Sequence, residues 1–154
     1  MKRVERAIAH IAENINGKAV LEIACGCAEF SLAAAQTAKS VDGIDLDYLR
    51  LPPQAHKTED FAFTIMDATN MTFADGSFDT AVMYNAIGHL GAVLEKVLKE
   101  CLRVTKPGGA IFVISSFRMD MSAIDEKLLP LLAKKQIAFA EENDGTFRYI
   151  KIER

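Results

Sequence analysis

The fold class of this chain is decided by one stretch, Val20-Leu21-Glu22-Ile23-Ala24-Cys25-Gly26-Cys27-Ala28-Glu29-Phe30-Ser31. An apolar strand that carries one carboxylate, Glu22, runs into a turn with small residues at every second position: Ala24, Gly26 and Ala28. A helix is expected over residues 30–38. Small residues let a ligand approach the backbone closely, because at most a methyl group stands in the way. The stretch therefore predicts a strand, a tight turn and a helix that together bind a cofactor.

The composition is typical of one globular domain, since the chain has 154 residues, half of them hydrophobic and a quarter charged. The formal net charge is −3, so we expect no nucleic-acid partner. No apolar run approaches the roughly 20 residues that a membrane span needs. Residues 1–17 predict an amphipathic helix rather than a signal peptide, because charges interrupt their apolar positions. Three cysteines without an export signal indicate reduced thiols and a cytoplasmic protein.

Strands and helices are expected to alternate along the chain. Short apolar runs predict strands at residues 20–24, 41–46, 61–66, 80–84 and 110–114. Apolar spacing predicts helices at residues 30–38, 90–104 and 124–135, and Lys106-Pro107-Gly108-Gly109 is expected to turn the chain after the second of them. Residues 136–141 and 147–152 flank a predicted hairpin turn. The fold class that follows is α/β: a doubly wound, mostly parallel seven-stranded sheet with a C-terminal antiparallel hairpin and helices on both faces.

The polar residues that could bind a ligand fall near the ends of these strands. In open sheets of this kind, ligands bind beyond the carboxyl ends of the strands. Glu22, Asp45, Asp67, Tyr84 and Asn85 all fall at or near such ends. A purely structural interpretation also exists, in which Glu22 anchors backbone amides of the turn and the two aspartates cap strand ends. The joint placement of these side chains favours one shared binding site.

Two carboxylates discriminate between candidate cofactors. Asp45 lies 23 positions after Glu22, where a carboxylate can accept hydrogen bonds from a ribose diol and would repel a 2′-phosphate. Glu29 stands where the dinucleotide fingerprint has its third glycine, and its charge would repel a pyrophosphate. A cofactor without phosphate that carries a sulfonium cation tolerates these acids better. The pattern therefore disfavours NAD and favours S-adenosylmethionine.

The chain resembles the class I S-adenosylmethionine-dependent methyltransferases, which have a Rossmann-like fold. Five motifs carry the resemblance in the family's order, across residues 18–116: Val20-Leu21-Glu22-Ile23-Ala24-Cys25-Gly26, Val41-Asp42-Gly43-Ile44-Asp45, Asp67-Ala68, Phe73-Ala74-Asp75-Gly76-Ser77-Phe78-Asp79 and Leu102-Arg103-Val104-Thr105-Lys106-Pro107-Gly108-Gly109. The resemblance implies a single methyltransferase-like domain over residues 1–154. Within it we expect an N-terminal helix at 1–17, the cofactor-binding core at 18–116, and a C-terminal helix and hairpin at 117–154.

The resemblance also implies roles for particular residues in binding S-adenosylmethionine and its product S-adenosylhomocysteine. The turn from Glu22 through Ala24 and Gly26 would hold the methionine part, with Glu22 near the amino group. Asp45 would accept hydrogen bonds from the ribose, and Leu46 would pack against the adenine. Asp67 and the amide of Ala68 would bind the adenine edge. Tyr84 and Asn85 would border the methyl group that is transferred.

Few residues point to catalysis itself. His89 follows the fourth strand and is the candidate general base, although a histidine packed at the start of a helix is the simpler interpretation. Cys25 and Cys27 are too close for a usual zinc pair, so they are interpreted as small buried turn residues and no metal site is expected. Alanine stands at 24 and 28, where the family more often has glycine.

Two functions stay open. One is a methyltransferase that moves a methyl group to a small-molecule acceptor by in-line displacement. The other is a non-catalytic methyltransferase-like domain that binds a nucleoside cofactor or a protein partner. The chain has little sequence available for an acceptor pocket, so either the acceptor is small or a second subunit of a homo-oligomer completes the pocket. The apolar run at residues 128–132 suits such an interface or the core equally well.

Overall fold

One seven-stranded sheet organises the molecule, and the computed structural model describes all 154 residues. Its strands are β1 (Ala19–Ile23), β2 (Ser40–Asp45), β3 (Phe61–Ile65), β4 (Phe78–Tyr84), β5 (Thr105–Ser115), β6 (Ala140–Asn143) and β7 (Arg148–Glu153). Their order in the sheet is β3-β2-β1-β4-β5-β7-β6, in which β1 to β5 are parallel and β7 is antiparallel to both neighbours. The predicted fold class is confirmed. The strand order reverses between β1 and β4, which places a ligand crevice at their carboxyl ends.

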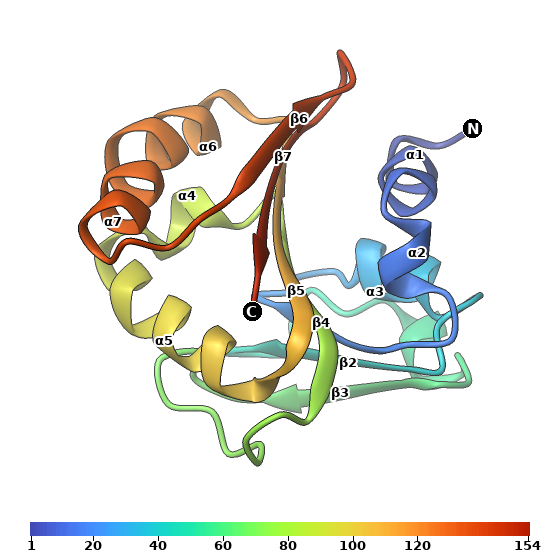
Figure 1. Ribbon diagram of the computed structural model, residues 1–154. Coiled ribbons are helices and arrows are strands. Elements are labelled where there is room, and N and C mark those ends of the chain that lie inside the picture. The colour runs from blue at the N-terminus through green and yellow to red at the C-terminus, as the bar shows by residue number, and fades with distance from the viewer.

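Helices cover both faces of this sheet, as Figure 1 shows. The helices on one side are α1 (Arg3–His10), α2 (Ala12–Ile15) and α3 (Glu29–Ala34). Those on the other side are α4 (Ile87–Leu90), α5 (Leu94–Val104), α6 (Arg118–Ala123) and α7 (Leu129–Lys134). Shorter helical turns are η1 (Pro53–His56), η2 (Gly91–Val93) and the π-helical η3 (Ile124–Leu128). None of these helices combines the length and the apolar character of a membrane span.

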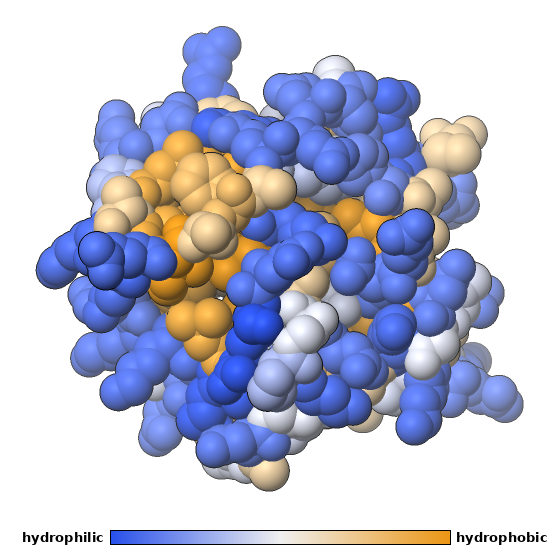
Figure 2. All heavy atoms as spheres, in the orientation of Figure 1, coloured by the Kyte–Doolittle hydropathy of each residue, from blue (hydrophilic) through white to orange (hydrophobic).

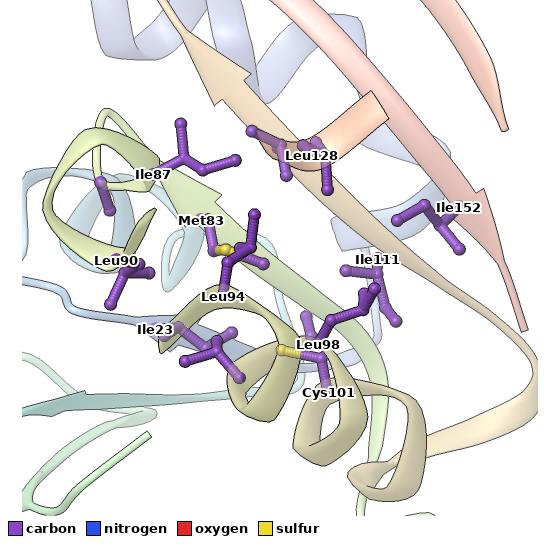
Figure 3. Packing of buried hydrophobic residues seen from close by; sticks show 14 of the residues in the cluster. Ile23, Met83, Ile87, Leu90, Leu94, Leu98, Cys101, Ile111, Leu128 and Ile152 are labelled. Atoms are coloured by element: carbon purple, nitrogen blue, oxygen red, sulfur yellow. The ribbon is translucent and has the colours of Figure 1, made fainter. Parts of the chain in front are cut away.

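A separate apolar core lies on each face of the sheet. Figure 3 shows the larger core, in which side chains from α4, α5 and η3 meet those of β1, β4, β5 and β7. From α5 it receives Leu94, Val97 and Cys101, which keep the expected helical spacing, and also Leu98. The smaller core packs Phe30 of α3 and residues of α1 against the opposite face. Because strands β1, β4 and β5 contribute to both cores, apolar contacts hold their carboxyl ends from two sides.

Several expected elements have different bounds. The helix expected at 30–38 ends at Ala34, and the single helix expected at 90–104 is α4, a 3-10 turn and α5 in succession. The helix expected at 124–135 starts earlier, because residues 118–123 already form α6, and it contains the π-helical segment. The differences arise at two short segments, the 3-10 turn between α4 and α5 and the π-helical segment between α6 and α7. The helices on either side of each segment still bury apolar residues in the same core.

The Lys106-Pro107-Gly108-Gly109 segment is part of strand β5, and the expected turn takes the form of a bulge, since Phe78 pairs with Thr105 and Thr80 already pairs with Ala110. Gly109 lies so close to β4 that an added Cβ would stand 2.5 Å from the backbone oxygen of Asp79. The amide of Gly108 donates to the oxygen of Arg154 at 3.0 Å, and the amide of Arg154 donates to the oxygen of Gly109 at 2.9 Å. These glycines therefore permit close strand pairing at an irregular register.

Most of the face in Figure 2 is hydrophilic, and an apolar area lies where Figure 1 places α4, α6 and α7. Within the run at residues 128–132, Leu128 and Leu132 are fully buried in the larger core. Packing within the chain therefore accounts for these two leucines.

Candidate functional site

The turn after β1 adopts the left-handed backbone conformation at alternate residues. The φ angles are 56° at Ala24, 54° at Gly26 and 59° at Ala28. The left-handed region costs roughly 1–2 kcal/mol for a residue with a Cβ, so the two alanines are strained and the glycine is not. The amide of Cys25 donates to the oxygen of Ile44 at 3.0 Å, which ties the turn to β2.

The two cysteines of this turn differ in exposure. Cys25 is buried, but Cys27 is exposed, so the interpretation of both as buried residues is wrong for Cys27. Burial raises the pKa of the Cys25 thiol well above its usual range.

Glu22 lies beneath the turn with only 2% of its surface exposed. Its Oε1 accepts hydrogen bonds from the amide of Ser31 at 3.0 Å and from the hydroxyl of Ser31 at 2.7 Å. Burial raises the pKa of Glu22 to about 8, and the bonds from Ser31 offset only part of that rise. In the structure Glu22 thus anchors the first turn of α3, and it is mostly protonated near neutral pH.

Asp45 connects the turn after β1 to the loop after β2. Its Oδ2 accepts from the amide of Gly26 at 2.8 Å, and its Oδ1 accepts from the amide of Leu46 at 2.7 Å. Each carboxylate oxygen can accept a second hydrogen bond. Asp45 therefore keeps capacity for two ligand hydroxyls while it holds the two loops together.

Asp67 and Ala68 follow β3 on the same edge of the sheet. The Oδ1 of Asp67 accepts from the amide of Thr69 at 2.8 Å and from its hydroxyl at 2.7 Å. These two bonds hold the pKa of Asp67 below its usual range, so the exposed carboxylate is ionised. Its Oδ2 has no partner within the chain and is available to a donor on a ligand.

Tyr84 and Asn85 end β4 in different environments. The Tyr84 ring is buried against Phe30 and Phe147, with ring centroids 5.4 and 5.7 Å away. Asn85 has a φ of 48°, and its Oδ1 accepts from the amide and the hydroxyl of Ser116 at 2.8 and 3.2 Å. The asparagine thereby joins the ends of β4 and β5.

His89 lies on the short helix α4, directly after this strand end. Its amide donates to the oxygen of Ala86 at 3.0 Å, and the amide of the preceding Gly88 donates to Asp120 of α6 at 2.8 Å. The imidazole is exposed and forms no hydrogen bond within the chain. Its backbone is therefore fixed, while its ring nitrogens are free to meet a ligand.

Two adjoining cavities collect all the predicted site residues. The larger, of about 360 Å³, is lined by Asp45, Leu46, Asp67, Ala68 and His89, among others. The smaller, of about 120 Å³, is lined by Glu22, Gly26 and Tyr84, among others. Both are bordered by the same four residues, Ala24, Arg50, Asn85 and Phe117. The predicted site residues thus lie together at the carboxyl ends of the strands, where ligands bind in open sheets of this kind.

Two of the shared residues were not predicted. Arg50 lies in the loop after β2, and Phe117 directly precedes α6 with 53% of its surface exposed. Both follow strand ends, so the rule that located the aspartates could have indicated these loops. Neither residue stands in a motif, and only the path of each loop brings its side chain back to the crevice.

A larger groove, of about 580 Å³, lies away from the strand ends. It is lined by residues of α5 and of the segment after α7, about half of them apolar, and it includes an ion pair of 2.7 Å between Glu95 and Lys135. None of the predicted site residues lines it. We therefore assign the site to the crevice at the carboxyl ends.

Comparison with known proteins decides the family. The sequence profile of a family described as a methyltransferase domain matches residues 21–113, which is more than half of the chain. The chain belongs to this family. The resemblance to class I S-adenosylmethionine-dependent methyltransferases is confirmed, and S-adenosylmethionine is the cofactor of that class.

Some known proteins are similar to this methyltransferase domain in sequence, and others are similar to it in fold. Demethylmenaquinone methyltransferases of Renibacterium salmoninarum and Paenarthrobacter aurescens are 31% and 36% identical over 112 and 101 residues, or 73% and 66% of this chain. These matches cover 47% and 39% of the two relatives, so the chain spans less than half of their length. A solved S-adenosylmethionine-dependent methyltransferase of Aquifex aeolicus superposes with a TM-score of 0.79 at 15% identity, covering 96% of this chain and 89% of that one.

Proposed function

We propose that this domain is an S-adenosylmethionine-dependent methyltransferase that acts on a small-molecule acceptor. The observation that carries the proposal is the pair of adjoining cavities, one lined by Asp45 and Asp67 and the other by the small-residue turn. The larger cavity is within the range of about 300–1,000 Å³ that is usual for ligand sites. The residues present also fit the cofactor chemically. The ribose hydroxyls and the adenine amino group of its adenosine donate hydrogen bonds, and the carboxylates of Asp45 and Asp67 accept them.

Each part of the site has a role in this proposal. Asp45 accepts hydrogen bonds from the ribose hydroxyls, and Asp67 accepts from the adenine amino group. Leu46 and Ala68 border the adenine, and the Ala68 amide donates to the ring. Glu22 and the turn at Ala24 and Gly26 lie beside the methionine part. When bound, the cofactor supplies a methyl group on a sulfonium, which is already activated for in-line displacement.

The protein then contributes geometry and exclusion of water more than acid–base chemistry. Asn85 and Phe117 border both cavities. An acceptor bound at their junction would therefore contact these two residues next to the cofactor. A general base is required only when the acceptor must lose a proton. His89 lines the larger cavity with a free imidazole, and we assign it that role. Demethylmenaquinone methyltransferases are among the relatives, which supports an acceptor of the quinone class.

The alternative is a domain that binds the cofactor without catalysis. In the sequence, this alternative is favoured by the methyl groups of Ala24 and Ala28 and by the short acceptor region. Ala28 is fully buried and lines neither cavity, so its methyl group does not narrow the crevice. Only Ala24 adds bulk there. This observation supports the catalytic proposal over the alternative.

Calorimetry tests the cofactor assignment. We expect heat of binding with S-adenosylmethionine and S-adenosylhomocysteine and none with NAD. Asp45→Asn should weaken S-adenosylhomocysteine binding by about tenfold or more, because ribose hydroxyls lose a charged acceptor. Glu59→Gln removes the same charge from an exposed position outside both cavities and should leave the affinity unchanged. Absence of binding to either sulfur cofactor would contradict the proposal.

Catalysis is tested by release of S-adenosylhomocysteine from S-adenosylmethionine in the presence of small phenols and quinols. If His89→Ala lowers turnover and leaves cofactor affinity unchanged, the result supports His89 as the general base. Cofactor binding without turnover on any acceptor would favour the non-catalytic domain.

A further inference from the structure

Arg50 occupies the junction of the two cavities. It is one of the four residues that border both of them. Its guanidinium lies against the backbone of Gly26, because a Cβ added at Gly26 would stand 3.0 Å from Nη1 and 3.2 Å from Cζ of Arg50. A side chain at position 26 would therefore displace the guanidinium, in addition to straining a φ of 54°.

Short-range hydrogen bonds in the loop after β2 direct Arg50 to this place. The loop starts at Leu46, whose amide is held by Asp45. The amide of Leu49 then donates to Oδ1 of Asp47 at 3.0 Å, and the amide of Leu51 donates to the oxygen of Tyr48 at 3.0 Å. These bonds reverse the chain, so that Arg50 returns over the turn after β1.

Arg50 is the only permanently charged cation that lines either cavity. The other ionisable side chains there include four carboxyl groups, those of Glu22, Glu29, Asp45 and Asp67. Although these acids are near, the guanidinium forms no hydrogen bond and no ion pair within the chain. All five of its N–H donors are therefore available, in the planar arrangement that matches a carboxylate.

We propose that Arg50 binds the carboxylate of the amino-acid tail of S-adenosylmethionine, an inference that rests on the proposed function. That tail carries an ammonium and a carboxylate together. Glu29 in the smaller cavity suits the ammonium, but it repels the carboxylate. Only Arg50 can neutralise it there, and a guanidinium does so through two parallel hydrogen bonds.

A pair of ligands that differ only in the carboxylate tests this role. S-adenosylhomocysteine and its decarboxylated counterpart are titrated into the wild-type chain, Arg50→Gln and Arg118→Gln. Arg118 is the matched control, since it is exposed, has no ion pair and lines neither cavity. Arg50→Gln should weaken S-adenosylhomocysteine about tenfold to a hundredfold and leave the decarboxylated ligand within about twofold. Arg118→Gln should change neither affinity.

The possible failures are distinguishable. An equal loss for both ligands in Arg50→Gln, or no loss for either, would overturn the role of Arg50. If the wild-type chain binds neither ligand, the proposed function itself fails. Thermal unfolding of each variant confirms that the chain is folded, which is expected because the Arg50 side chain is exposed.

Discussion

The turn after β1 and the turn after β4 both begin with a residue in the left-handed backbone conformation, but the two residues differ in type. Each leaves its strand through a left-handed residue that borders both cavities: Ala24 with a φ of 56° and Asn85 with a φ of 48°. Asparagine tolerates this conformation, and its side chain also holds Ser116 of the neighbouring strand end. Alanine has no such contact. The first turn is instead held by side chains outside it, Glu22 and Asp45.

The difference teaches where each turn is vulnerable. The second turn depends on its own side chain, so one substitution there removes both the tolerance of left-handed geometry and the hydrogen bonds. The first turn depends on buried and ionisable neighbours, so pH and charge affect it more than substitution of its small residues. Three measurements separate these dependencies.

The largest effect is expected from the ionisation of Glu22 beneath the first turn. Its pKa rises from 4.5 to about 8 on folding, so between these pH values the folded chain keeps a proton that the unfolded chain has lost. The free energy of unfolding therefore falls as the pH rises across this range, by on the order of 5 kcal/mol from this group. Urea unfolding at several pH values measures the fall.

Glu22→Gln is the control for this prediction, because its amide oxygen can still accept from Ser31 but cannot ionise. The difference in unfolding free energy between the two chains isolates the contribution of Glu22 from those of other acids. Equal pH dependence in both chains would show that Glu22 does not retain its proton.

Asn85→Ala should give the next largest effect, a loss of about 2–4 kcal/mol in the free energy of unfolding. The Ser116 amide loses its acceptor, and the new residue is strained at a positive φ. Asn85→Gly loses the same hydrogen bonds without that strain, so it should destabilise the chain less. If the two variants unfold at the same denaturant concentration, backbone strain at position 85 has no cost.

Ala24→Gly should give the smallest effect and the opposite sign, a gain of about 1 kcal/mol or less. Glycine removes the backbone strain at φ 56°, which stabilises the folded chain. Its greater conformational freedom in the unfolded chain offsets part of that stabilisation. Ala28→Gly relieves similar strain, yet it also removes a fully buried methyl group, so its net effect should be near zero. A loss of stability in Ala24→Gly would contradict the idea that the first turn is strained.

The sheet could be predicted from the sequence because its signals are local. The apolar runs that form β1, β2 and β3 start and end within one or two residues of their predicted bounds. Asp45 is the last residue of β2 and Asp67 stands two residues after β3, so their positions at the carboxyl ends of neighbouring strands are enough to bring them together. Glu22 was placed in the site as well, although its bonds to Ser31 show that it also has a structural role.

Features that depend on loop paths or on contacts between distant segments could not be predicted. The break between α4 and α5 falls at Gly91–Val93, within a continuous apolar pattern. Gly109 is required by its proximity to the backbone of Asp79, 30 residues earlier in the chain. Arg50 reaches the crevice only because the bonds of Asp47 and Tyr48 reverse its loop. No periodicity encodes any of these contacts.

The double engagement of Asp45 has a consequence for the thermodynamics of ligand binding. Ordering a flexible side chain when a ligand binds costs about 0.5–1.5 kcal/mol in lost rotamer entropy. The Asp45 carboxylate is already oriented by the Gly26 and Leu46 amides, at 2.8 and 2.7 Å. Its rotamer freedom is therefore given up once, when the domain folds, and a diol that arrives later meets two oxygens already in position.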